Sequence, residues 1–391
     1  MHYKKLCATV LAVSLLSGCS LFGDDDVVKM SPLPQVENQI NVQKMWSTSI
    51  GDGAGKIYSL LQPAYANGIV YAADRDGTVK AINSASGKVV WKVNLSDKTG
   101  FFSSNQPAQL SGGVTYSDNT LYVASEKAQL YALNSSDGSL LWRVTVSGEV
   151  LAQPAVGENT VLVNTSNGYL QALNAETGVT KWTINLGMPL LALRGDSTPV
   201  IAHGAAVVGS NTGRVSAVLL NQGQYIWQQR IAKPGGSTEI SRLSDVDATP
   251  LIVEEIVYAT AYNGYLVAID LRTGQPIWQK DFGTVLDMVA ENEKLFIVTN
   301  NDTVIALNRI TSEVLWSQDK LLHRGLTAPV IYGEQLVIGD SEGYLHWLSK
   351  RDGHFVAQNK VSGSGLLAGP IVAGSQLMIQ ANNGTLYSFL Q

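Results

Sequence analysis

The residues of this sequence that could do chemistry are few, and the most conspicuous set is a serine between two glycines. Gly339-Asp340-Ser341-Glu342-Gly343 fits the G-x-S-x-G pattern of a hydrolase nucleophile. In that pattern the serine lies on a sharp turn from a strand into a helix. Here the five residues separate two short apolar runs, which predicts the turn of a β-hairpin. We therefore expect no catalytic residue at Ser341.

A second set has the beginning of a cation site. Asp74-Arg75-Asp76-Gly77 opens like a calcium loop, but the later acidic ligands of such a loop are missing. Turn chemistry explains the motif, because other units hold Asn-Gly pairs at the same place, namely Asn167-Gly168, Asn263-Gly264 and Asn383-Gly384. At Asn263-Gly264 we expect a tight hairpin with positive φ at both residues. The five histidines lack metal-ligand spacing, so we predict neither a metal nor a cofactor.

A cysteine near the N-terminus has the surroundings of a lipidation site. Two lysines precede the apolar stretch 6–16, which is too short to span a bilayer. Leu16-Ser17-Gly18-Cys19 then resembles the bacterial lipoprotein signal, which implies cleavage of residues 1–18 and acylation of Cys19. Ser20 follows, where an aspartate would resemble an inner-membrane retention signal. The resemblance therefore implies an anchor in the outer membrane, facing the periplasm. The alternative is an ordinary secretory peptide. Residues 19–42 would form an acylated, mobile tether.

Tryptophan recurs along the rest of the chain with the same neighbours each time. Five of the seven recurrences close the pattern Gly-x-x-x-Trp, and six have an alanine ten residues before them. The seven are Trp46, Trp91, Trp142, Trp182, Trp227, Trp278 and Trp316, separated by 45, 51, 40, 45, 51 and 38 residues. A period in this range indicates a repeat architecture.

Each repeat reads as four short strands rather than as helices. In residues 250–282, apolar runs at 250–253, 256–261, 265–270 and 276–280 are separated by Glu-Glu, Asn-Gly and Thr-Gly turns. Helical periodicity is absent, which disfavours an α-solenoid. A four-stranded antiparallel unit of this length is the size of a propeller blade.

Counting these units predicts an all-β, eight-bladed β-propeller over residues 43–391. Seven units are complete. The eighth begins at Pro370 and has only three strands, near 370–373, 376–381 and 385–390. The missing strand lies at the other end of the chain, at 43–49 around Trp46. Pairing it with the last unit would close the ring and leave no open sheet edge.

The seventh unit exchanges a large for a small residue. Ala357 occupies its tryptophan position, and Trp347 occupies its alanine position. We hypothesise that the indole of Trp347 fills part of the volume that a tryptophan at position 357 would occupy.

Composition narrows the classes of function. The chain has 391 residues, 37 glycines and a net charge of −5, which suits a β-rich globular protein with many tight turns and a large core. No cluster or stripe of Lys and Arg occurs, so nucleic-acid binding is not expected.

The repeat resembles that of quinoprotein dehydrogenases, whose eight blades hold pyrroloquinoline quinone. The shared pattern is Gly-x-Leu/Val-x-Ala-Leu/Ile followed by Thr-Gly-x-x-x-Trp, and it covers nearly all of residues 43–391. The resemblance implies a possible enzyme with a central calcium site. Those enzymes are usually longer, and no concentrated set of acidic and amide residues stands out here. The repeat therefore supports the fold, which alone does not give a function.

A second resemblance is more specific. The lipoprotein signal, the acidic tether, the eight units and two inter-unit segments, 189–199 and 236–250, together resemble the propeller lipoprotein family of the outer-membrane β-barrel assembly machinery. The resemblance implies a non-enzymatic scaffold that binds the central barrel subunit, BamA, through its POTRA domains and aids insertion of outer-membrane proteins. Whether unfolded clients are also contacted is left open.

The same two segments stand out without the resemblance. Each connects the fourth strand of one unit to the first strand of the next, and each is longer than its counterpart at 146–154. Extra length on one face of a rigid scaffold is where binding residues gather. The first segment offers Leu191 and Leu193 beside Arg194, and apolar anchors rimmed by charge suit a protein interface.

The predicted partner-binding residues are therefore Leu191, Leu193, Arg194, Asp245 and Asp247. The two aspartates, in the second segment, would either meet the partner or hold Arg194. The alternative is that both leucines are buried beneath the loop and the charges pair with each other. Two other classes of function stay open: a membrane-anchored quinoprotein enzyme, and a propeller that binds sugars or peptidoglycan.

Overall fold

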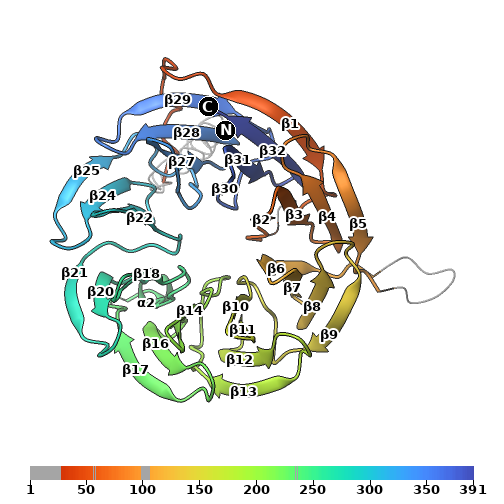
Figure 1. Ribbon diagram of the computed structural model, residues 1–391. Helices are drawn as coiled ribbons and strands as arrows, with labels where there is room; N and C mark the ends of the chain where they lie inside the picture. Colours follow the sequence, from red (N-terminus) through yellow and green to blue (C-terminus); the bar gives the residue numbers. More distant parts are fainter. Residues whose placement is uncertain (1–27, 56, 58, 98–105, 234, 236) are drawn as a thin grey trace, which may run out of the picture.

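The chain folds into a closed ring of eight four-stranded antiparallel sheets (Figure 1). This computed structural model describes residues 28–55, 57, 59–97, 106–233, 235 and 237–391. The first strand of each blade lies nearest the ring axis and the fourth lies on the circumference. The predicted fold class is confirmed. The predicted signal peptide (1–18) and Cys19 lie outside the described residues.

The blades are numbered here in chain order. Blades 1 to 4 are formed by the following strands: β2 (Ala64–Ala66), β3 (Ile69–Ala73), β4 (Thr78–Asn83) and β5 (Val89–Asn94); β6 (Leu110–Ser117), β7 (Thr120–Ser125), β8 (Gln129–Asn134) and β9 (Leu140–Thr145); β10 (Ala155–Gly157), β11 (Thr160–Thr165), β12 (Tyr169–Asn174) and β13 (Thr180–Asn185); β14 (Val200–Ala202), β15 (Ala205–Ser210), β16 (Arg214–Leu219) and β17 (Tyr225–Arg230).

Blades 5 to 8 follow the same order, and the last one takes its outer strand from the N-terminal part of the chain. Their strands are β18 (Leu251–Val253), β19 (Ile256–Thr260), β20 (Leu266–Asp270) and β21 (Pro276–Lys280); β22 (Val289–Glu291), β23 (Lys294–Val298), β24 (Val304–Asn308) and β25 (Val314–Gln318); β26 (Val330–Tyr332), β27 (Gln335–Gly339), β28 (Tyr344–Ser349) and β29 (Phe355–Lys360); β30 (Ile371–Ala373), β31 (Gln376–Gln380), β32 (Thr385–Leu390) and β1 (Gln43–Ser49).

The core lies between neighbouring blades. The second and third strands of a blade are buried on both faces, so they read as continuous apolar runs rather than as alternating ones. One such layer packs Tyr71 and Val79 of blade 1 against Leu121 and Val123 of blade 2. The fourth strands of blades 2 and 3 alternate between exposed and half-buried residues, because only their inward-facing side chains reach this layer.

The recurring tryptophans join each blade to the next. The indole Nε1 of Trp91 donates to the carbonyl of Ser135 at 2.9 Å, and the ring lies against Gly138, where a Cβ would come within 2.7 Å of it. The other six tryptophans of the series also donate to carbonyls of the following blade, at 2.8–3.2 Å. Their role is structural, since each tryptophan packs between the sheets of two neighbouring blades.

Blade 7 places its exchanged pair side by side. Trp347 on β28 pairs in register with Ala357 on β29, and both side chains are fully buried in the same apolar cluster. The indole also contacts the ring of Tyr332 edge-on, with 5.8 Å between centroids. This arrangement is the one that the volume-exchange hypothesis requires.

The ring closes as the sequence predicts. β1 pairs antiparallel with β32, with Trp46 opposite Ser388, so the last blade gains its fourth strand from the N-terminal side. Trp46 then donates to the carbonyl of Ser84 in blade 1 at 2.8 Å. One strand therefore completes blade 8 and joins it to blade 1.

The serine motif and the aspartate motif considered as chemical sites are both turns. Residues 340–343 connect β27 to β28. The carboxylate of Asp74 accepts hydrogen bonds from the backbone N–H groups of Gly77 and Thr78. The expectation for Asn263-Gly264 is wrong in detail, because neither residue has a positive φ. Instead Gly264 forms a bridge with Ala232 of the preceding connector, and a Cβ on Gly264 would lie 2.6 Å from the carbonyl oxygen of Ile231.

The segment before β1 is held against blade 7, which shortens the predicted tether. Ser31 donates from its N–H to the carbonyl of Leu322 at 2.9 Å, and Gln39 donates likewise to Val356 at 2.8 Å. Asn38 exchanges hydrogen bonds with the backbone of Gln358. We call residues 31–40 the N-terminal strap. Because these backbone and amide groups are bonded to the propeller, this part of residues 19–42 is not a free linker.

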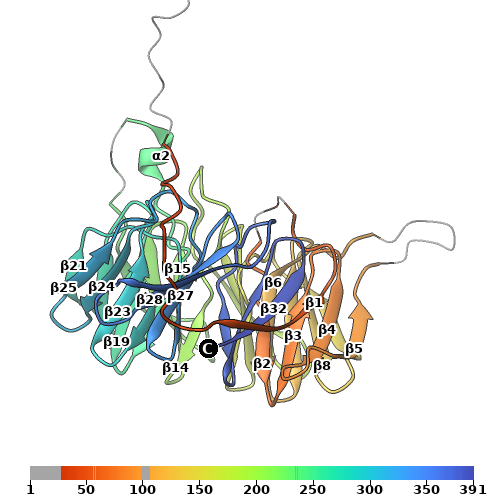
Figure 2. The same ribbon diagram turned by 90° about the horizontal axis from the view of Figure 1, so that it is seen from above.

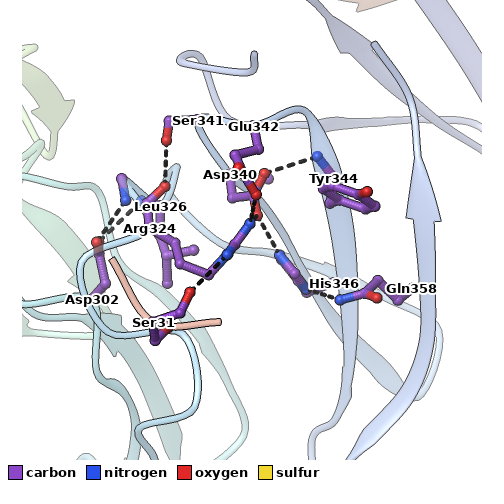
Figure 3. Close-up of polar contacts among 12 residues, drawn as sticks. Ser31, Asp302, Arg324, Leu326, Asp340, Ser341, Glu342, Tyr344, His346 and Gln358 are labelled. Atoms are coloured by element: carbon purple, nitrogen blue, oxygen red, sulfur yellow. Dashed lines mark hydrogen bonds and ion pairs between the residues drawn. The ribbon is translucent and has the colours of Figure 1, made fainter. Parts of the chain in front are cut away.

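A buried ion cluster lies beneath the strap (Figure 3). Arg324, with 1% of its side chain exposed, donates to Asp340 at 2.9 Å, to the carbonyl of Ser31 at 2.9 Å, and to Glu342. His346 contacts the same carboxylate of Asp340 at 2.9 Å. Burial raises the pKa of Asp340, but the hydrogen bonds from His346, Tyr344 and Arg324 outweigh it and leave that pKa below its usual value. The cluster therefore carries an ionised carboxylate in the core.

Candidate partner-binding site

The two long connectors lie on one face of the ring. Residues 186–199 lead from β13 to β14, and residues 231–250 lead from β17 to β18 and include the short helix α2 (Glu239–Arg242). Figure 2 shows α2 projecting from this face, which we call the connector face. Within the described residues, no helix is long and apolar enough to cross a membrane.

The first connector presents an apolar patch to solvent. Leu191 is 49% exposed and Leu193 is half-buried, so the alternative that both leucines lie buried beneath the loop is wrong. The sequence prediction also missed Met188 and Leu190, which are 57% and fully exposed. Their signal was present in the same Met-Pro-Leu-Leu-Ala-Leu run. We call these four residues the apolar patch.

Arg194 is fixed beside the patch by carboxylates from other blades. Its guanidinium lies 3.2 Å from Glu126, in the β7–β8 hairpin, and 3.0 Å from Glu149, in the β9–β10 connector. Glu126 is also held by Arg75 at 2.6 Å. With 42% of its side chain exposed, Arg194 keeps part of its guanidinium accessible next to the leucines. Nothing in the repeat pattern indicated Glu126 or Glu149 as its partners.

Asp245 and Asp247 have a different role from the one predicted. In the described part of the chain neither forms an ion pair with Arg194. Asp245 is fully buried, and its Oδ1 accepts the backbone N–H of Leu193 at 2.9 Å. A carboxylate without accessible surface does not meet a partner. Asp245 therefore fastens the loop that carries the apolar patch to the second connector.

Asp247 faces the ring axis instead of the patch. Together with Asp196 and Asp287 it lines a cavity of about 70 Å³ that the connectors enclose around the axis. Burial raises the pKa of Asp196 to about 7 and that of Asp247 to about 8, the latter also through repulsion from Asp245 and Asp196. Within the described residues, no group of three or more His, Cys, Asp and Glu side chains could hold a metal ion.

These raised pKa values make stability depend on pH. A folded carboxyl with a pKa above its unfolded value of 3.8 binds its proton more tightly than the unfolded chain does. The contribution of Asp247 to the free energy of unfolding is then highest at low pH and falls as pH rises from about 4 toward about 8. We expect Asp247→Asn to raise the free energy of unfolding at pH 8 by about 1–3 kcal/mol, with a smaller gain at pH 5. Urea denaturation at both pH values measures this, and equal gains at both would contradict it.

Comparisons with known proteins place this geometry in a family. The sequence profile described as "Outer membrane protein assembly factor BamB" matches residues 75–318. The protein of that name from Escherichia coli strain K12 is 58% identical over 386 residues, which cover 98% of each chain. The crystal structure of BamB from Moraxella catarrhalis superposes with a TM-score of 0.80 at 25% identity, covering 90% of this chain and all of that one. A europium-containing methanol dehydrogenase, at 12% identity and a TM-score of 0.71, shares the fold alone.

Proposed function

This chain belongs to the family of outer membrane protein assembly factor BamB, and on that premise we propose that it is a non-enzymatic scaffold in the assembly of outer-membrane proteins. The observation that carries the proposal is the apolar patch. Its connector is fastened from below by Asp245 and from the side by the ion pairs of Arg194. Exposed leucines on a fixed backbone bind a protein with little loss of conformational entropy.

The partner that we propose is the central barrel subunit of the assembly machinery, bound through its periplasmic POTRA domains. Leu191 and Leu193, together with the exposed Leu190, would enter an apolar pocket of that partner. The exposed side of Arg194 would meet its polar rim. Asp245 acts as a positioning residue, because it holds the N–H of Leu193 without reaching the surface.

The anchor that we propose is an acylated Cys19 in the outer membrane, with the propeller in the periplasm. The N-terminal strap rises from β1 toward the connector face, as Figure 2 shows. Cys19 precedes Ser31 by 12 residues, and Ser31 is the first residue of the described chain with a hydrogen bond to the propeller. That length of chain spans at most about 40 Å. An acylated Cys19 would therefore keep the connector face within this distance of the membrane.

A double substitution in the apolar patch tests the proposed function. We expect Leu191→Ser with Leu193→Glu to abolish co-purification with the barrel subunit from solubilised outer membranes. The reason is that the variant loses the apolar contact and places a charge in the interface. Thermal unfolding should show a folded propeller. The matched control is Val89→Ser with Val90→Glu, which changes two exposed residues of β5, 46% and 56% accessible, on the circumference. Retained co-purification of a folded patch variant would refute the proposed interface.

A further inference from the structure

A groove beside the apolar patch contains two arginines that have no acidic partner among the described residues. The groove, of about 650 Å³, opens between blades 3 and 4 where the first connector leaves β13. Its lining includes Pro189, Arg214, Tyr225 and Arg230. The hydroxyl of Tyr225 donates to the carbonyl of Asn185 at 3.0 Å and so joins the two blades along the groove.

The two arginines face each other across neighbouring strands. Arg214 begins β16, Arg230 ends β17, and the two are paired in register. Arg214 is half-buried and Arg230 is exposed. In the part of the chain that the structure describes, neither guanidinium forms an ion pair and no acidic residue lines the groove. Like charges directly opposite each other destabilise an antiparallel pair. The arrangement therefore weakens the fold unless an anion lies between the two side chains.

The equivalent positions of other blades avoid this arrangement. Blade 1 pairs Thr78 with Asn94, blade 2 pairs Gln129 with Thr145, and blade 3 pairs Tyr169 with Asn185. In blade 7 a lysine does occur, but Lys360 lies over the ring of Tyr344 at 4.2 Å from its centroid. Across the described strands of the eight blades, only blade 4 places two cations opposite each other at this position. The fold therefore does not require two arginines at this strand position, since other blades have neutral or aromatic residues there.

We propose that this pair of arginines binds carboxylate side chains of the same protein partner that covers the apolar patch. Guanidinium groups match carboxylates in a planar, two-bonded geometry, and two of them provide a site for a short acidic segment. Pro189 lines the groove and directly precedes Leu190, so one partner surface reaches both. The partner would then place acidic residues next to the apolar pocket that receives the leucines. This inference rests on the proposed function, because it extends the same interface.

The test measures affinity and its dependence on salt. The full-length chain is titrated with the full-length barrel subunit in detergent micelles, at low and at high salt. We expect Arg214→Gln with Arg230→Gln to weaken binding about tenfold at low salt and to flatten the salt dependence. The thermal midpoint of this variant should not fall, since a like-charge pair is removed. The control is Arg272→Gln with Arg351→Gln, which removes two charges from exposed arginines, 75% and 86% accessible, on other blades.

The outcomes separate this inference from the proposed function. If the arginine variant binds with unchanged affinity and salt dependence while the leucine variant fails to bind, the inference is overturned and the proposed function stands. If the leucine variant binds as well as the parent, both are overturned. The arginine variant is also tested on vesicles that contain phosphatidylglycerol. Normal binding to the barrel subunit with lost binding to these vesicles would assign the groove to lipid phosphates and overturn the inference.

Discussion

Replacing Arg324 by alanine is expected to lower the free energy of unfolding by about 3–5 kcal/mol. The guanidinium is 1% exposed, and Asp340 beneath it is fully buried. Without the arginine, Asp340 keeps His346 and the N–H of Tyr344 as partners but loses a fully charged one. An incompletely compensated charge in the core is among the most costly changes that a single substitution makes.

The same substitution should also release the N-terminal strap. Arg324 donates to the carbonyl of Ser31 and so holds the first bonded residue of the strap (Figure 3). Equilibrium denaturation in urea measures the loss of stability, and limited proteolysis of residues 31–40 measures the release. Arg351→Ala is the matched control, because its side chain is 86% exposed and its ion pair is with the neighbouring Asp352. Exposed ion pairs contribute roughly 0–1 kcal/mol. A cost for Arg324→Ala within that range would contradict the role assigned to the buried cluster.

Replacing Trp227 by alanine is expected to cost about 3–5 kcal/mol. Its indole is 9% exposed, donates to the carbonyl of Leu271 at 2.8 Å and packs in the layer between blades 4 and 5. Truncation removes the hydrogen bond and leaves a cavity between two sheets. Urea denaturation of the full chain measures the cost.

Two glycine substitutions separate the contact with the indole from backbone strain. Gly274 has a φ of +72°, and a Cβ there would lie 2.5 Å from the indole of Trp227. Gly68 has a φ of +79° with nothing within 4 Å of the added atom. Gly68→Ala should therefore cost only the strain of a left-handed alanine, about 1–2 kcal/mol, while Gly274→Ala should cost clearly more. Equal costs would mean that the glycine and the indole do not form a tight contact.

The architecture could be predicted from the sequence because every blade of a propeller has the same local pattern of strands and turns. Each blade contains the same order of strands and turns, so the seven recurring tryptophans, five of them in Gly-x-x-x-Trp, were enough to reveal the repeat. Ring closure could be predicted because the last unit has only three strands and the first strand of the chain supplies the missing fourth. The exception at Asn263-Gly264 has a tertiary cause. The preceding connector pairs with Gly264 through Ala232, and this contact replaces the expected hairpin geometry.

The sequence predicted where the candidate site lies, but not which residues contact one another within it. The long connectors and the exposure of Leu191 were as expected, because extra length on one face interrupts a periodic pattern. The roles of Asp245 and Asp247 differed from the expected ones, because the sequence of a loop does not show whether an aspartate in it is exposed or buried. Asp245 holds the backbone of Leu193, 52 residues away in the chain.

The sequence by itself determined the repeat, the number of blades, the closing strand and the face on which the long connectors lie. These features depend on local periodicity, which every unit repeats. Only the tertiary structure decided which groups the arginines meet: Arg194 meets Glu126 and Glu149, Arg324 meets Asp340 and the carbonyl of Ser31, and Arg214 lies opposite Arg230. Most of these pairs join different blades or the strap, and the two facing arginines line a groove between two blades. Their neighbours are set by the curvature of the closed ring, which no local pattern encodes.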